Sequence, residues 1–104
     1  MSTIKTYQKE KFSQINLDDG NKILLSYGVT DIRVFRLGFL SIPKETVHIF
    51  NNEFTNKLTQ KIGYDLSKDI IKILADELVK ANSMKEIEEI CFRLEKDKNF
   101  LEKI

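Results

Sequence analysis

The residue pattern of the chain changes once, near residue 50. Residues 1–50 hold short runs of Ile, Val, Phe and Tyr separated by turn residues, which is typical of strands. Residues 51–104 carry apolar side chains at three- and four-residue spacing among Lys and Glu, which is typical of helices. No repeat, low-complexity tract or Ser/Gly/Pro-rich linker accompanies the change. We therefore predict a single α+β domain over 1–104, with a sheet half (1–50) and a helical half (51–104).

A four-stranded antiparallel meander is predicted in the first half. The sequence Asp-Asp-Gly-Asn at 18–21 indicates a tight hairpin, because Gly accepts the positive φ that such a turn needs. Short connections between successive strands imply antiparallel pairing. Gly38 is a candidate bulge in a long third strand, and Pro43 is expected to end that strand. The predicted strands are 12–17, 22–27, 32–42 and 47–50.

Three helices packed on the sheet are predicted in the second half, giving the order ββββααα. Asn51 or Asn52 is a good N-cap for the first helix, and Gly63 is a good C-cap. The second helix should begin near Asp65 or Ser67 and pair antiparallel with the third, because only a short connection joins them. The side chains expected to be deeply buried in these two helices are Ile70, Leu74, Leu78, Ile87, Cys91 and Leu94.

The charge balance argues against polyanionic partners. The chain has 17 Lys plus Arg against 16 Asp plus Glu, a net charge of +1. No apolar run approaches the roughly 20 residues that cross a bilayer, and residues 1–8 lack the apolar core of a signal peptide. We therefore expect a soluble, cytoplasmic protein without a membrane partner and without the basic balance of a nucleic-acid-binding domain.

Motifs for a metal, a cofactor or a small molecule are absent from the sequence. One Cys and one His do not make a zinc site, and the four glycines have neither dinucleotide-binding nor P-loop spacing. The carboxylate pairs Asp18/Asp19 and Asp65/Asp69 are assigned to a turn and to a helix start. We therefore predict no cofactor, no metal site and no small-molecule ligand, and we assign Cys91 to core packing.

Two alternative functions remain open. His48 would serve a small enzyme of an unfamiliar class if the fold brought Tyr27, Tyr64 or an acid beside it. Residues 35–40 (Phe-Arg-Leu-Gly-Phe-Leu) partly resemble the strand motif with which RNA-recognition domains stack bases, which implies weak nucleic-acid binding by the sheet face. The predicted order of elements differs from the βαββαβ order of those domains.

The predicted third strand is apolar on both faces, whereas a sheet with one wet face should alternate apolar with polar residues. Because side chains alternate across a strand, one face receives Arg33, Phe35, Leu37 and Phe39, and the other receives Ile32, Val34, Arg36, Leu40 and Ile42. The helices are expected to cover one face only. We therefore take as a candidate interface Arg33, Phe35, Leu37 and Phe39.

These patterns favour a small non-enzymatic binding or regulatory module that acts through protein–protein contacts. An apolar patch left uncovered by the helices would mark a homodimer interface or the site of another protein partner. The competing expectation is that the first helix, or the apolar pair Phe100 and Leu101, crosses to the second face and covers it. Helix placement of this kind cannot be derived from periodicity.

Overall fold

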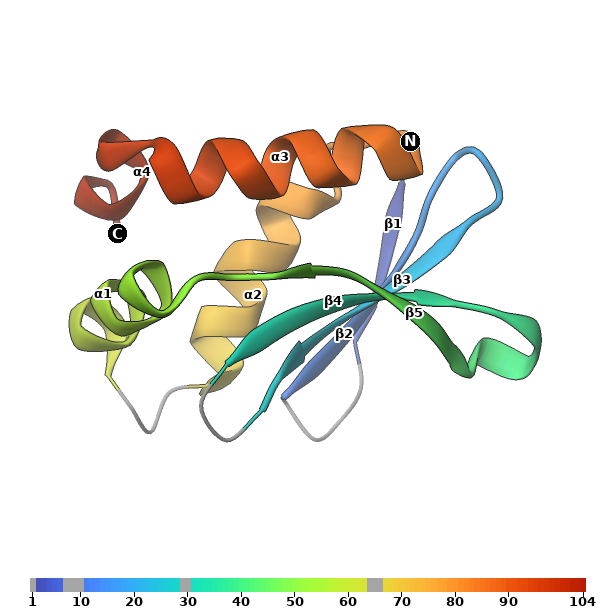
Figure 1. The fold of residues 1–104 in the computed structure, drawn as a ribbon, viewed down its shortest axis with the longest axis horizontal. Helices are drawn as coiled ribbons and strands as arrows, with labels where there is room; N and C mark the ends of the chain where they lie inside the picture. Colours follow the sequence, from blue (N-terminus) through green and yellow to red (C-terminus); the bar gives the residue numbers. More distant parts are fainter. Residues whose placement is uncertain (1, 7–10, 29–30, 64–66) are drawn as a thin grey trace.

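In the computed structural model, the first half of the chain forms an antiparallel sheet and the second half forms helices (Figure 1). The structure describes residues 2–6, 11–28, 31–63 and 67–104, and the side chains of these residues except 3–6. Within these ranges the strands, in sequence and in spatial order, are β1 (Thr3–Thr6), β2 (Phe12–Asn16), β3 (Lys22–Tyr27), β4 (Ile32–Leu37) and β5 (Pro43–Ile49). A 3-10 turn, η1 (Phe39–Ser41), joins β4 to β5. The helices are α1 (Asn52–Ile62), α2 (Ser67–Leu78), α3 (Met84–Lys96) and α4 (Lys98–Glu102).

The predicted fold class is confirmed: an antiparallel meander is followed by helices that pack on it. The described part of the sheet has one more strand than predicted, because Thr3–Thr6 pairs with β2. The sequence of β1 is Thr-Ile-Lys-Thr. An edge strand needs little apolar surface, so a short polar stretch of this kind gives no strand signal in the sequence. A short fourth helix, α4, also follows α3, where only an apolar tail was expected.

The prediction of a third strand over 32–42 is wrong in its extent. β4 ends at Leu37 and the chain then turns through η1. The turn is closed at its base, where the Gly38 N–H donates to the carbonyl of Ile42 at 2.8 Å. Pro43 begins β5 and pairs with Leu37 instead of ending the ladder. Pro is tolerated at this position because β5 is an edge strand and Pro43 is its first residue.

The helices cover one face of the sheet. α2 packs on β2 and β3, and α3 packs on β5. Side chains from this face and from all four helices form one core cluster. Its fully buried strand residues are Ile15, Ile23, Leu25, Ile32 and Val34. The six helix residues predicted to be deeply buried are all buried in the same cluster, so the predicted apolar faces of α2 and α3 are confirmed.

The predicted antiparallel pairing of the second and third helices is wrong. α2 and α3 contact each other, but Figure 1 shows α3 crossing the upper end of α2 instead of running alongside it. This crossing lets α3 reach β5, which lies beyond the strands that α2 covers. Of the two expected starts of the second helix, Ser67 is the first residue of α2, and Asp65 lies outside the described residues.

The predicted caps of the helices are confirmed. The Asn51 side chain accepts from the Phe54 N–H at 2.7 Å, which caps α1. Gly63 ends the same helix with a φ of 121°, a value that L-residues with side chains rarely adopt. Ser83 is the N-cap of α3, and its hydroxyl accepts from the Glu86 N–H.

The hairpin between β2 and β3 is the predicted structural turn. Gly20 has a φ of 89°, which explains why glycine stands at this position. One oxygen of Asp19, Oδ1, accepts from the Asn21 N–H at 2.9 Å. The other, Oδ2, accepts from the Asn21 side chain at 2.9 Å and from the Met84 N–H at 3.2 Å. The Asp19 carboxylate therefore fastens the hairpin to the first turn of α3.

We expect Asp19 to contribute a pH dependence to stability in acid. Its pKa is lowered from 3.8, mainly by the hydrogen bond from the Asn21 backbone. The hydrogen bonds to the Asp19 carboxylate therefore stabilise the folded state fully above pH 3.8. This stabilisation is lost as the pH falls through the lower pKa that Asp19 has in the folded state. A carbon-13 NMR titration of the Asp19 carboxyl should give a pKa below 3.8, and Asn21→Ala should move it upward. A pKa at or above 3.8 in the unsubstituted protein would contradict the role of these bonds.

We expect the same hairpin to be indifferent to divalent cations. Its polar groups bind one another and the start of α3, and the described residues contain no group of three or more His, Cys, Asp or Glu side chains that could hold a metal ion. A calcium loop takes ligands from about a dozen residues, more than this turn provides. Thermal melting curves with and without millimolar calcium or magnesium should coincide. A clear upward shift of the melting temperature would show a metal site.

Candidate protein interface

The sheet face opposite the helices carries three of the four predicted interface residues. In the register of the sheet, Phe35 stands opposite Leu24, and Arg33 stands opposite both Ser26 and Ile49. Directly opposed residues of antiparallel strands share a face. We call this surface the open face. Its described apolar members are Phe12, Leu24, Phe35, Leu37 and Ile49.

Apolar exposure on the open face is greatest at the end where β2 begins and β5 ends. Phe12 is 39% exposed and Ile49 is 49% exposed, whereas Leu24 and Phe35 in the middle are half-buried. Leu37 shares the face but is only 7% exposed, so it offers little contact area. Arg33 is exposed, and its guanidinium pairs with the Asp31 carboxylate at 2.9 Å. The open face thus has a half-buried apolar centre, and at the more exposed end Ser26 and the ion-paired Arg33 lie between Phe12 and Ile49.

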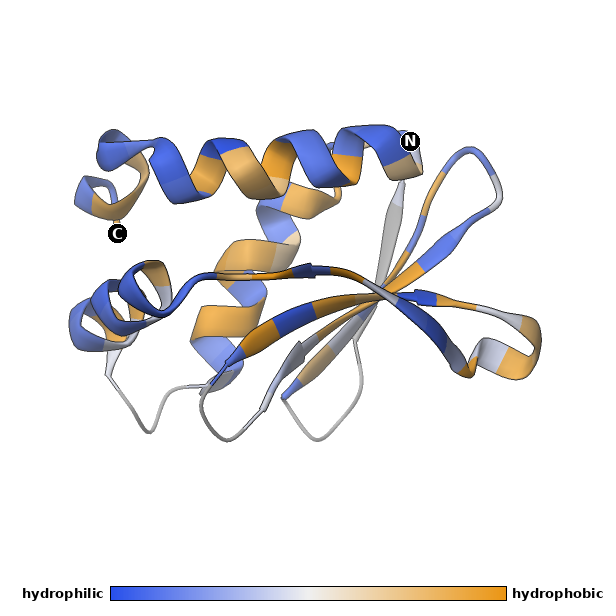
Figure 2. Ribbon diagram, in the orientation of Figure 1, coloured by the Kyte–Doolittle hydropathy of each residue, from blue (hydrophilic) through white to orange (hydrophobic). Residues whose placement is uncertain are grey.

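The fourth predicted residue, Phe39, does not lie on the sheet, because the chain leaves β4 before reaching it. It is 87% exposed in η1, and its neighbours Leu40 and Ile42 are 75% and 59% exposed. We call residues 39–42 the tip. Figure 2 shows it as a hydrophobic stretch at the far right, where the connection between β4 and β5 projects beyond the rest of the sheet. The alternation assumed for Leu40 and Ile42 is therefore also wrong, although both side chains are exposed.

The expectation that the first helix or the C-terminal apolar pair covers the second face is not met among the described residues. Phe54 of α1 and Phe100 of α4 stack with 6.1 Å between their ring centroids. Both belong to the core cluster on the side of the sheet that faces α2. Leu101 packs against the same cluster. No described helix therefore lies on the open face.

His48 does meet an acid, as the enzyme alternative requires. Its Nε2 lies 2.5 Å from Oε1 of Glu95 in α3, and both side chains are 8% exposed. The second carboxylate oxygen of Glu95 accepts from the Asn51 N–H at 2.9 Å. The imidazole also packs edge-on against Phe50 and Phe92, at 4.9 and 5.0 Å between ring centroids. This cluster links β5, α3 and the N-terminus of α1, so the contact between His48 and Glu95 has a structural role.

Tyr27 and Tyr64 do not strengthen the enzyme alternative. Tyr64 lies outside the described residues, and Tyr27 packs against the core at the end of β3. Cys91, the one thiol of the chain, is fully buried, and burial first and the charge of Glu95 next raise its pKa to about 12. The thiolate is the reactive form of cysteine, so this thiol is suited to packing and not to nucleophilic chemistry.

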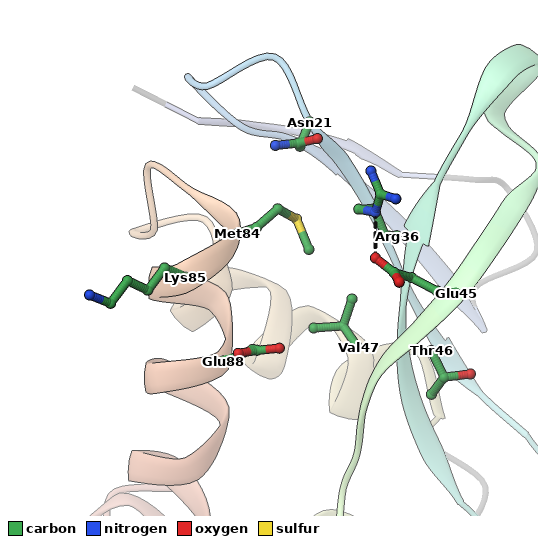
Figure 3. A pocket seen from close by; sticks show the side chains of 8 residues that line it. All are labelled: Asn21, Arg36, Glu45, Thr46, Val47, Met84, Lys85 and Glu88. Carbon is green, nitrogen blue, oxygen red and sulfur yellow. Dashed lines mark hydrogen bonds and ion pairs between the residues drawn. The ribbon is translucent and has the colours of Figure 1, made fainter.

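A pocket of about 370 Å³ lies between the sheet and the N-terminal half of α3 (Figure 3). On one wall the Arg36 Nε donates to Oε1 of Glu45 at 2.6 Å. On the other wall Glu88 points toward Val47, while Lys85 points out of the pocket (Figure 3). The lining contains no Cys, Ser or His, and its polar side chains are those of Asn21, Arg36, Glu45, Thr46, Lys85 and Glu88.

Two further observations concern the chain as a whole. Among the described residues, no helix combines the length and the apolar character needed to span a membrane. Comparison with protein-family models, with curated proteins and with solved structures found no match in any of the three.

Proposed function

We propose that the protein is a small, cytoplasmic, non-enzymatic binding or regulatory module that acts through protein–protein contacts and forms a homodimer. The observation that supports this proposal is apolar exposure on the open face and the tip, where no described helix packs. Exposed large apolar side chains gathered on one side of a small domain often mark an interaction site, although here they form two groups, the tip and the end of the open face that carries Phe12 and Ile49. The five most exposed apolar residues of this surface are Phe12, Phe39, Leu40, Ile42 and Ile49.

The exposed area is of the order that an interface needs. With roughly 200 Å² for each large apolar residue, the exposed fractions of these five residues amount to on the order of 600 Å² per protomer. A standard interface buries about 800 Å² on each partner. The half-buried Leu24 and Phe35, with the polar residues around them, would supply the remainder. A second copy of the chain offers the same apolar surface in return, which a two-fold dimer requires.

The two alternatives have weaker support. The contact between His48 and Glu95 is the one observation that favours an enzyme, and it also has the structural explanation given above. Arg33 and Phe35 share the open face, which favours weak nucleic-acid binding, but Arg36 lies on the other face and pairs with Glu45. A mixed oligonucleotide pool that shows no shift at low salt would remove the nucleic-acid alternative.

A dilution series followed by two-dimensional amide NMR tests the proposal and maps the contact. Between about 20 and 500 μM, the amide signals of β4, of the tip and of Ile49 should move with concentration, because dimers form and dissociate as concentration changes. The signals of the outward face of α3, for example Glu89, should stay in place. Movement confined to the helices, or no movement together with a monomeric tumbling time at the highest concentration, would contradict the proposal.

A further inference from the structure

The tip is held in a conformation that costs backbone free energy. Leu40 has φ 59° and ψ 26°, and Ser41 has φ 57°. This left-handed region is unfavourable for residues with side chains, and such strain tends to be retained where a function requires it. Hydrogen bonds hold the turn, since the Ser41 N–H donates to the Gly38 carbonyl at 3.1 Å and the Ile42 N–H donates to the Phe39 carbonyl at 3.3 Å.

The chain gains no core contact from this turn. None of the three residues of η1 is buried. The side chains of Phe39 and Leu40 are instead presented to solvent on a closed, hydrogen-bonded loop. A pre-ordered apolar loop loses little conformational entropy when a partner covers it, which favours binding.

The two most exposed apolar parts of the surface lie at opposite ends of the open face. The tip follows Leu37, at one end of β4. Ile49 stands opposite Arg33 near the other end of β4, and Phe12 stands opposite Ser26 in the same part of the sheet. Phe35 lies between the two ends and is half-buried. Consider two copies that pack with their open faces together, related by a two-fold axis that lies parallel to the sheets, perpendicular to the strands and close to Phe35. Such an axis would bring each tip to the far end of the partner's sheet.

We propose that, in the homodimer, the tip of each protomer packs on the end of the partner's open face that carries Phe12 and Ile49. This inference rests on the proposed function, because it specifies how the two copies meet. The tip accounts for more than half of the exposed apolar area estimated above and extends past the end of its own sheet. A face-to-face contact that left the tips in solvent would therefore fall well short of the roughly 800 Å² per partner of a standard interface.

The charges of the open face are compatible with this arrangement. The axis places each strand on the same strand of the partner, running in the opposite direction, with Phe35 and the opposed Leu24 at its centre. Lys22 would therefore lie near the partner's Ser26, and Arg33 near the partner's Leu37. Neither described cation of the face would then oppose another cation. Like charges brought together in an interface would instead disfavour association.

Disulfide crosslinking between two variants of the protein, each with one added cysteine, tests this arrangement. Leu40→Cys protein and Ile49→Cys protein, both altered at exposed positions, are mixed and oxidised with diamide. A crosslinked heterodimer is expected on a non-reducing gel, because a disulfide needs the two Cα atoms within about 7 Å. The buried Cys91 should not react in the folded protein. Each variant oxidised alone is the control and should give little crosslink.

Each outcome decides between arrangements. A strong crosslink of Leu40→Cys with itself would show that the tips meet each other, and would overturn the inference. Absence of the mixed crosslink in a sample that light scattering shows to be dimeric would also overturn it, while leaving the proposed function intact. A protein that is monomeric without any substitution would overturn both the inference and the proposed function.

A second measurement is the dissociation constant of the Phe39→Ser dimer. This constant should rise about tenfold or more, as it does on loss of an aromatic anchor. An unchanged constant would contradict the contact made by the tip.

Discussion

Phe35→Glu should weaken self-association strongly and leave the fold intact. Phe35 lies in the middle of the open face and is half-buried among its strand neighbours. In a two-fold dimer the substitution acts twice, and each copy would place an unpaired carboxylate in an apolar contact. Burying a charge without a partner is strongly unfavourable. We expect the dissociation constant to rise by at least about 100-fold, which corresponds to ~2.7 kcal/mol.

The effect on association is separable from an effect on folding. The core cluster lies on the opposite face of the sheet, so circular dichroism of the Phe35→Glu protein should match that of the unsubstituted protein. Asn56→Glu, on the exposed surface of α1, makes the same change of net charge away from the open face and should leave association unchanged. Sedimentation velocity on the three proteins measures the constants. A Phe35→Glu protein that associates as well as the Asn56→Glu protein would contradict the placement of the interface.

Leu74→Ala should cost about 2–5 kcal/mol of unfolding free energy, as truncation of other buried leucines does. Leu74 is in the middle of α2, has no exposed surface and belongs to the core cluster between the helices and the sheet. Rigid neighbours on both sides can close only part of the cavity that the substitution creates. A loss of this size is a large fraction of the stability of a small domain.

Urea titration followed by circular dichroism measures this loss as a shift of the midpoint at unchanged slope. Lys72→Ala on the exposed side of the same helix is the control, because surface substitutions usually change stability by no more than about 0.5 kcal/mol. A loss below ~1 kcal/mol for Leu74→Ala would mean that the buried face of α2 is assigned incorrectly.

The helices and the first hairpin were predictable because their signals are local. The spacing of apolar residues defines the buried face of α2 and α3, and the side chains of Asn51 and Ser83 cap the helices within three residues along the chain. Gly20 marks a turn whose geometry the residue itself permits. Local signals of this kind do not give the angle between α2 and α3, which depends on where β5 lies.

The tip was not predictable from alternation alone. Residues 32–42 are nearly all β-formers, so their pattern is compatible with one long strand as well as with a strand and a turn. The turn is formed by bonds between Gly38 and Ile42, which place Leu40 and Ser41 in a conformation that neither residue favours. The spacing of Gly38 and Pro43 is the one sequence signal that would have indicated it.

The candidate surface was predictable in part. Period-two alternation correctly places Arg33, Phe35 and Leu37 on one face. It does not show that Leu37 is buried or that Phe12 and Ile49 are the more exposed apolar members, since both facts depend on neighbouring strands. The contact between His48 and Glu95 joins residues 47 positions apart, which no sequence spacing reveals.

The molar mass of the protein in solution tests the central claim most directly. Size-exclusion chromatography with light scattering at ~100 μM should give an average mass clearly above the 12.2 kDa of one chain and rising toward twice that value as the loaded concentration increases, because dimers form in this concentration range. The same measurement on Phe35→Glu should give the mass of one chain. A strict monomer of 12.2 kDa for the unsubstituted protein at this concentration would contradict the claim.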